Sequence, residues 1–288
     1  MMNFLSKFAR KNSNSNTNSN AQNSAPLNLN EPQNFTPNSN ANSSDIIIKV
    51  QNLSKKFGDF VAVDDISFEV KRGEIFGFLG ANGAGKTTAM KILCAISLPS
   101  AGTAQVAGFD IYTQSEQIKQ NIGYMSQKFA LYENLKVWEN IALFGKIYAM
   151  TNAQIQSQMQ SLLTSLHFLD KKDALVRDLP LGFKQKLAFC VANFHAPKII
   201  FLDEPTGGVD PITRRQFWEQ IYAVARAGTC IFITTHYMDE AEYCDRVSIM
   251  VDGKIKALGT PSDLKREFNA SNMNGVFFTL AKNAKRGA

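Results

Sequence analysis

The eight residues Gly80-Ala81-Asn82-Gly83-Ala84-Gly85-Lys86-Thr87 constrain this chain more than any other feature of its sequence. They fit the pattern GxxxxGK[ST], in which glycines let backbone N–H groups converge on phosphate oxygens at the start of a helix. The apolar run at residues 75–79 is typical of a strand buried on both faces, and residues 86–97 have helical spacing. The segment therefore predicts a phosphate-binding loop between a central strand and a helix.

The residue types in this loop indicate which residues contact phosphate and which contact a metal ion. Lys86 is expected to reach the β- and γ-phosphates of a nucleotide and to act in catalysis, and the Thr87 hydroxyl is expected to ligate Mg²⁺. The expected nucleotide contacts are Gly80, Ala81, Asn82, Gly83, Ala84, Gly85, Lys86, Thr87 and Thr88.

An acidic pair follows a second apolar strand at residues 199–202. Parallel strands bring such residues to the carboxyl edge of the sheet, where ligands of α/β proteins bind. Asp203 is expected to hold Mg²⁺ through water, and Glu204 to orient or deprotonate an attacking water. An acidic pair alone is more often a turn or a helix cap, but after a phosphate-binding loop the catalytic interpretation is favoured.

A histidine ends a third buried strand, at residues 230–234. His236 is placed to reach a γ-phosphate, although its residue type alone fits a buried or loop histidine equally well. The other two histidines, His167 and His195, fall near helix ends and are interpreted as structural or exposed.

The chain divides into three parts. Residues 11–44 contain 12 Asn and 7 Ser, so residues 1–44 are predicted to be disordered because they bury too little apolar surface. From residue 45 onward, strand and helix patterns alternate around a helical insertion at about 128–195, which predicts an α/β domain with a mainly parallel sheet over 45–262. Residues 263–288 are expected to form a C-terminal extension.

Composition excludes several classes of protein. The net charge of +6 comes from the basic residues in 1–11 and 280–288, so the body of the chain is neutral and no nucleic-acid partner is predicted. The mean hydropathy is −0.17, and no apolar run approaches the roughly 18 residues of a membrane span. No secretory signal is recognised, and the scattered cysteines fit the reduced thiols of a cytosolic protein.

Together these motifs resemble the ATP-binding subunit of ATP-binding cassette (ABC) transporters, over residues 45–262. The resemblance implies a P-loop NTPase (RecA-like) core with a mainly parallel sheet, an antiparallel β subdomain and a helical subdomain insertion. It also implies that ATP and Mg²⁺ bind, that Phe57 stacks on adenine, and that His236 is the switch histidine. Gln127 is implied to be a catalytic and metal-contacting residue that senses Mg²⁺ and faces the membrane partner. The residues alone leave Phe57 open to a place in the core, and Gln127 to being an ordinary surface residue.

The family's signature segment is altered. Where the family has LSGG, this chain has Leu179-Pro180-Leu181-Gly182, so the serine hydroxyl that reaches the γ-phosphate on the opposite subunit is absent. The resemblance implies that Gly182 still faces that nucleotide. The segment, with Asp-Glu-Pro-Thr-Gly-Gly-Val-Asp-Pro at 203–211, is similar to the ABC-2 branch, which includes drug, polymer and lipid exporters.

The resemblance implies an ATPase that energises export through separate integral membrane permease subunits, at the cytoplasmic face of the inner (plasma) membrane. It implies pairing as a homodimer or as a heterodimer with a paralogous ATPase subunit. Two alternatives stay open: a soluble regulatory or translation-associated ABC protein, and a small-molecule kinase with a P-loop.

Overall fold

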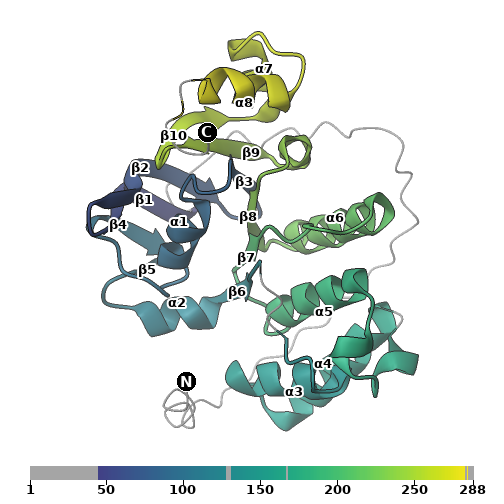
Figure 1. Ribbon diagram of the computed structural model, residues 1–288. Helices are drawn as coiled ribbons and strands as arrows, with labels where there is room; N and C mark the ends of the chain where they lie inside the picture. The colour runs from purple at the N-terminus through teal and green to yellow at the C-terminus, as the bar shows by residue number, and fades with distance from the viewer. Residues whose placement is uncertain (1–44, 128–130, 167, 283, 285–288) are drawn as a thin grey trace.

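The computed structural model describes residues 45–127, 131–166, 168–282 and 284 (Figure 1). The predicted disorder of residues 1–44 and the interpretation of His167 concern positions outside the described residues.

A six-stranded sheet forms the centre of the molecule, in the order β10-β9-β3-β8-β7-β6. Neighbours from β9 to β6 pair in parallel, and β10 pairs with β9 in the antiparallel sense. The predicted α/β fold with a mainly parallel sheet is therefore confirmed. The bounds are β3 Ile75–Gly80, β6 Ile122–Met125, β7 Ile199–Asp203, β8 Cys230–Thr235, β9 Arg246–Val251 and β10 Lys254–Gly259.

A second, antiparallel sheet has the order β2-β1-β4-β5 and corresponds to the implied β subdomain. Its strands are β1 Ile46–Phe57, β2 Phe60–Lys71, β4 Ala101–Val106 and β5 Phe109–Asp110. With α1 (Lys86–Leu93), this sheet lies on one side of the central sheet, and α5 and α6 lie on the other (Figure 1).

Side chains of the central strands alternate between two cores. Phe76 and Phe78 of β3 point into the core shared with the antiparallel sheet, while Ile75 and Leu79 point into the core under the helices. The Phe76 ring stacks on that of Phe68 with centroids 5.6 Å apart. Burial on both faces fixes the end of β3, and therefore the start of the glycine-rich loop.

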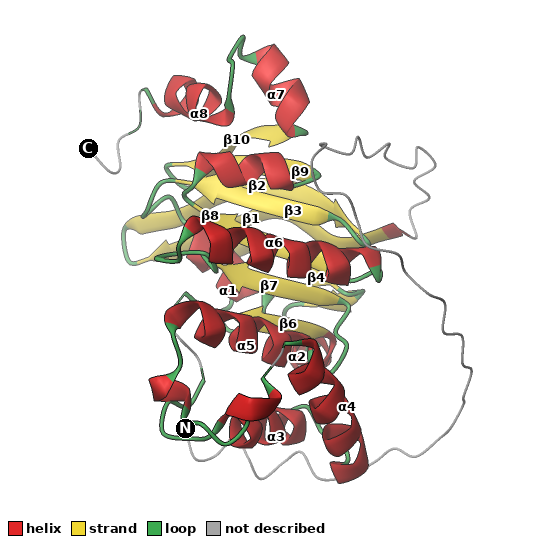
Figure 2. Cartoon of the chain, turned by 90° about the vertical axis from the view of Figure 1, so that its right-hand side faces the viewer, coloured by secondary structure: helices red, strands yellow, loops and turns green. Residues whose placement is uncertain are grey.

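Helix α2 buries Ile118 in the core shared with the antiparallel sheet, and the other helices cover the opposite face and both ends of the central sheet (Figure 2). Figure 2 shows α6 along that face, α3, α4 and α5 gathered beyond β6, and α7 and α8 beyond β10. None of the helices described is both long and apolar enough to cross a membrane. Their bounds are α2 Ser115–Asn121, α3 Val137–Ile147, α4 Asn152–Ser165, α5 Leu181–Asn193, α6 Pro211–Arg226, α7 Pro261–Glu267 and α8 Met273–Ala281.

One helix boundary differs from the sequence-based expectation. Helix α1 ends at Leu93 rather than near residue 97, because Ala95 adopts a left-handed φ of 53° and the chain turns back. Within the expected C-terminal extension, Met273 and Val276 of α8 are buried in the core beneath the central sheet, alongside Leu264 of α7.

His195 belongs to the packing of the helical insertion. Its ring stacks on Tyr148 with centroids 3.5 Å apart, and its Nε2–H donates to the carbonyl oxygen of Ile122 at 3.0 Å. Burial lowers the pKa of His195 from 6.5 to about 4, because the charged ring would lose its hydration. The imidazole is therefore neutral in the folded protein.

This neutral histidine predicts an acid sensitivity. The pKa of His195 is lower in the folded protein than in the unfolded chain, so the unfolded chain binds more protons below pH 6.5. The free energy of unfolding therefore decreases as the pH falls from 6.5 towards 4. Between pH 7 and pH 5 we expect His195 to remove about 2 kcal/mol from the free energy of unfolding. Urea unfolding at both pH values, compared with the non-titrating variant His195→Gln, measures this difference. An equal pH dependence in the two proteins would contradict it.

Candidate active site

The glycine-rich loop runs from the end of β3 to the first residue of α1. Gly80 and Gly85 have φ values of 153° and 108°, and a Cβ atom on either would collide with a backbone oxygen, that of Met250 or of Ala62. Gly83, with φ of 79°, faces open space. The loop is thus pressed against β2 and β9 while its tip stays free to approach a ligand.

Lys86 is held inside this loop. Its side chain is only 4% exposed, and its Nζ donates to the carbonyl oxygens of Gly80 at 2.7 Å and Ala81 at 3.1 Å. Nζ also lies 3.6 Å from Glu204 Oε1. Burial lowers the Lys86 pKa, and the Glu204 carboxylate opposes that shift. A phosphate bound at the loop would add negative charge beside the Lys86 ammonium group and so offset the cost of its burial.

Asp203 ends β7 with a nearly buried carboxylate, 2% exposed. Its Oδ1 accepts hydrogen bonds from the hydroxyls of Thr87 at 3.1 Å and of Thr234 at 2.6 Å. The hydroxyl of Thr87 and the carboxylate of Asp203 therefore meet at one point. Two converging hard oxygens beside a phosphate loop fit Mg²⁺, which takes few protein ligands and completes its shell with phosphate and water.

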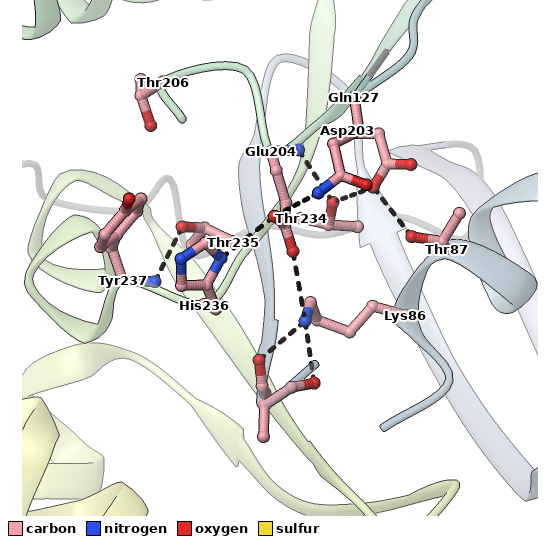
Figure 3. A network of polar contacts seen from close by, with 12 residues as sticks. Lys86, Thr87, Gln127, Asp203, Glu204, Thr206, Thr234, Thr235, His236 and Tyr237 are labelled. Carbon is pink, nitrogen blue, oxygen red and sulfur yellow. Dashed lines mark hydrogen bonds and ion pairs between the residues drawn. The ribbon is translucent and has the colours of Figure 1, made fainter. Parts of the chain in front are cut away.

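Glu204 is the centre of the contacts drawn in Figure 3. It has a φ of 49°, in the left-handed region, and its N–H donates to the Thr234 carbonyl at 3.0 Å. Gln127 Nε2 donates to Glu204 Oε2 at 2.9 Å, and His236 Nδ1 lies 3.1 Å from the same oxygen without hydrogen-bond alignment. Lys86, Gln127 and His236, from three separate segments, thus converge on one carboxylate.

Comparison with known proteins identifies the family of this chain. The sequence model of the ABC transporter family matches residues 63–207, from β2 through the acidic pair. The chain belongs to the ABC transporter family.

Individual relatives are similar to this chain over most of its length. The probable multidrug ABC transporter ATP-binding protein YbhF of Escherichia coli (strain K12) is 46% identical over 77% of this chain, which spans 38% of the length of YbhF. The Nod factor export ATP-binding protein I of Cupriavidus metallidurans is 36% identical over 76% of this chain and 72% of its own length. A solved ATP-binding subunit of an ABC transporter has a TM-score of 0.74 at 26% identity, over 82% of this chain and 99% of that one.

Two expected ABC site residues lie outside the cluster around Glu204. Phe57, at the end of β1, is 56% exposed, with Lys55 Nζ 5.1 Å from its ring centroid, so it is not part of the core. Gly182 lies in the first turn of α5, where a Cβ atom would come within 2.5 Å of Thr213 Cγ2 on α6. A Cβ atom here would displace the Thr213 side chain, so Gly182 favours close packing of α5 on α6.

Sequence reasoning missed Thr234, which donates to Asp203 and accepts from the Glu204 N–H at 3.2 Å. The available signal was a hydroxyl residue near the carboxyl end of an otherwise apolar strand, next to the strand that carries the acidic pair. Within the described part of the chain, no cluster of three or more His, Cys, Asp and Glu side chains forms a separate metal site.

The close contact at Gly85 predicts a severe effect of adding one methyl group. Gly85→Ala combines an unfavourable φ, about 1–2 kcal/mol, with the collision against the Ala62 carbonyl. We expect a loss of ATP affinity of at least tenfold and a lowered melting temperature. Gly108→Ala is the matched control, since Gly108 has a φ of 87° but nothing within 4 Å of its Cβ position. ATP affinity is measured by titration calorimetry, and equal effects of the two variants would contradict the prediction.

Proposed function

We propose that this chain binds and hydrolyses ATP, and that it energises an ABC-2-type export system through separate integral membrane permease subunits. The observation that carries this proposal is the convergence of Lys86, Gln127 and His236 on Glu204, beside the pair formed by Thr87 and Asp203. The printed names of the relatives, a multidrug transporter protein and a Nod factor export protein, support the export role.

The chemistry follows from the positions of the side chains. Loop N–H groups, the α1 N-terminus and Lys86 would bind the β- and γ-phosphates. Thr87 and Asp203 would hold Mg²⁺, with Gln127 near by, and the ion would neutralise charge on the phosphate oxygens. Glu204 would take a proton from the water that attacks the γ-phosphorus as the bond to ADP breaks. His236 would donate to the γ-phosphate, and Phe57 would stack on the adenine ring.

Pairing of two ATPase subunits completes this proposal. Gly182 and the α5 N-terminus would face the nucleotide held by the opposite subunit, either a second copy of this chain or a paralogue. The pair would sit on its permease at the cytoplasmic face of the inner membrane.

The proposed reaction predicts a specific defect in Glu204→Gln. The amide keeps the size of the side chain but cannot take the proton, so we expect turnover to fall by at least about 10²-fold. ATP binding should persist, and ATP should trap a dimer. Phosphate release and size-exclusion chromatography with ATP measure both effects. Glu242→Gln, which removes the charge of an exposed carboxylate paired with Lys265, is the control. Near-normal turnover in Glu204→Gln would refute the assignment.

The altered signature segment predicts a gain of function. Pro180 precedes α5 without a side-chain cap, and its carbonyl accepts from the Lys184 N–H at 3.0 Å. Pro180→Ser adds a hydroxyl, and a hydrogen bond to a charged phosphate is worth about 1.5–3 kcal/mol. We therefore expect ATP-dependent dimerisation to tighten by about tenfold or more in the Glu204→Gln background.

Pro180→Ala is the control, since it removes the proline ring without adding a hydroxyl. Analytical ultracentrifugation with ATP measures the dimer dissociation constant. Unchanged or weaker dimerisation in Pro180→Ser would show that the proline is not a deficit at this site.

A further inference from the structure

A buried carboxylate lies behind the active site. Glu240, in the 3₁₀ helix Met238–Tyr243, is 0% exposed. Its Oε1 accepts a short hydrogen bond of 2.5 Å from the hydroxyl of Thr206, which is itself 1% exposed. A carboxylate removed from water is costly unless hydrogen bonds and charge compensate it, so this contact needs a reason.

Charge compensation of Glu240 is incomplete. Arg214 Nε on α6 lies 3.9 Å from Glu240 Oε1, too far for a hydrogen bond, while Arg214 Nη1 reaches Asp239 Oδ2 at 3.5 Å. Glu240 Oε2 and Arg214 Nε are buried without a hydrogen-bond partner among the residues described. Thr206 is thus the residue that directly satisfies this carboxylate, and an apolar pair would be the cheaper way to fill the space.

The bond joins the two segments that carry catalytic side chains. Thr206 follows Glu204 by two residues, and Glu240 follows His236 by four. Local hydrogen bonds hold the second segment: the Tyr237 N–H donates to Thr235 Oγ1 at 3.0 Å, and the Glu240 N–H donates to the Tyr237 carbonyl at 3.2 Å. Arg214 also lies over the Tyr237 ring, 4.8 Å from its centroid. A bond between Thr206 and Glu240 therefore fixes the loop after β7 to the loop after β8.

We propose that Thr206 and Glu240 are positioning residues for the reaction: their hydrogen bond holds Glu204 and His236 at the separation that hydrolysis requires. This inference rests on the proposed ATPase function. In this proposal neither Thr206 nor Glu240 touches the nucleotide, and both act through the backbone of short loops. Glu204 needs such support, because its left-handed φ of 49° is maintained only by its surroundings.

The expected effect is on turnover rather than on nucleotide binding. The phosphate loop is anchored by β3, β2 and β9 and does not depend on this bond. Misplacing a catalytic group by about 1 Å costs up to about 10²-fold in rate. Thr206→Val, which replaces the hydroxyl by a methyl group of similar size, should lower kcat by about tenfold or more and leave KM for ATP within about twofold.

The experiment uses the full chain and compares three threonine variants. Thr206→Ser keeps the hydroxyl and should restore kcat to within about threefold of the original chain. Thr229→Val is the matched control, since Thr229 precedes β8 at the opposite end, where its hydroxyl donates to the Pro197 carbonyl at 3.4 Å. It should leave kcat unchanged.

A spectroscopic measurement separates positioning from general destabilisation. The chain has three histidines, so the ring ¹⁵N resonances of His236 can be assigned with His236→Gln. Thr206→Val should shift them without nucleotide, and Thr229→Val should not. If Thr206→Val does not fold, Glu240→Gln replaces it: the loss of the anionic acceptor should lower kcat and shift the same resonances.

Two failures can be told apart. A full kcat and unmoved His236 resonances in Thr206→Val, or in Glu240→Gln where that variant is needed, would overturn the positioning role while ATP hydrolysis by the original chain stands. Absence of hydrolysis in the original chain would overturn the proposed function, and the His236 resonances alone would then decide whether the bond joins the two loops.

Discussion

The parallel register of three central strands is the constraint on which the site depends. Asp203 pairs with Thr234 across β7 and β8, and Leu79 pairs with Thr235 across β3 and β8. The three strands therefore end at one level, and the polar residues at their carboxyl ends meet without long side chains. Phe232 fixes this register from within, because its ring lies 5.6 Å from Phe76 and 5.3 Å from Phe201.

The site is assembled from charges that compensate one another imperfectly. The Lys86 ammonium accepts no hydrogen bonds and is surrounded by two carbonyls and one carboxylate, so its burial is only partly offset. The Glu204 carboxylate contacts Lys86, Gln127 and His236 at the same time. A bound polyphosphate would compete for Lys86 and leave Glu204 with its two other neighbours. Release of Lys86 in this way would leave the Glu204 carboxylate more accessible to a water molecule.

Short-range features of this fold could be predicted from the sequence. Residue types at fixed spacing indicate the loop from Gly80 to Thr87 and the hairpin at Asp252-Gly253. Both hairpin residues have positive φ in the structure. Boundaries were harder, because Ala95 carries no sign of the left-handed φ that ends α1. The burial of α8 also escaped prediction, since its core partners lie elsewhere in the chain.

Contacts between residues far apart in the sequence are the other features that could not all be predicted. Thr206 and Glu240 are 34 residues apart, and Thr87 and Asp203 are 116 apart. The second pair could be anticipated because both residues belong to motifs with a known chemical logic. The first could not, since neither a threonine after an acidic pair nor a glutamate in a short helix indicates a partner. Only the adjacency of β7 and β8 brings them together.

Gly182 shows how one residue can satisfy two separate requirements. A glycine near the signature position is expected where backbone must approach a phosphate, and it also avoids a contact of 2.5 Å between a Cβ atom and Thr213 Cγ2 on α6. Leu181, beside it, is by contrast half exposed, and its Cδ2 lies 3.7 Å from the Cβ position of Gly208. Gly182 thus lies where α5 packs on α6, while the departures of the segment from the family pattern, Pro180 and Leu181, fall on exposed positions. A change confined to the surface alters what α5 presents to a partner and leaves the fold intact.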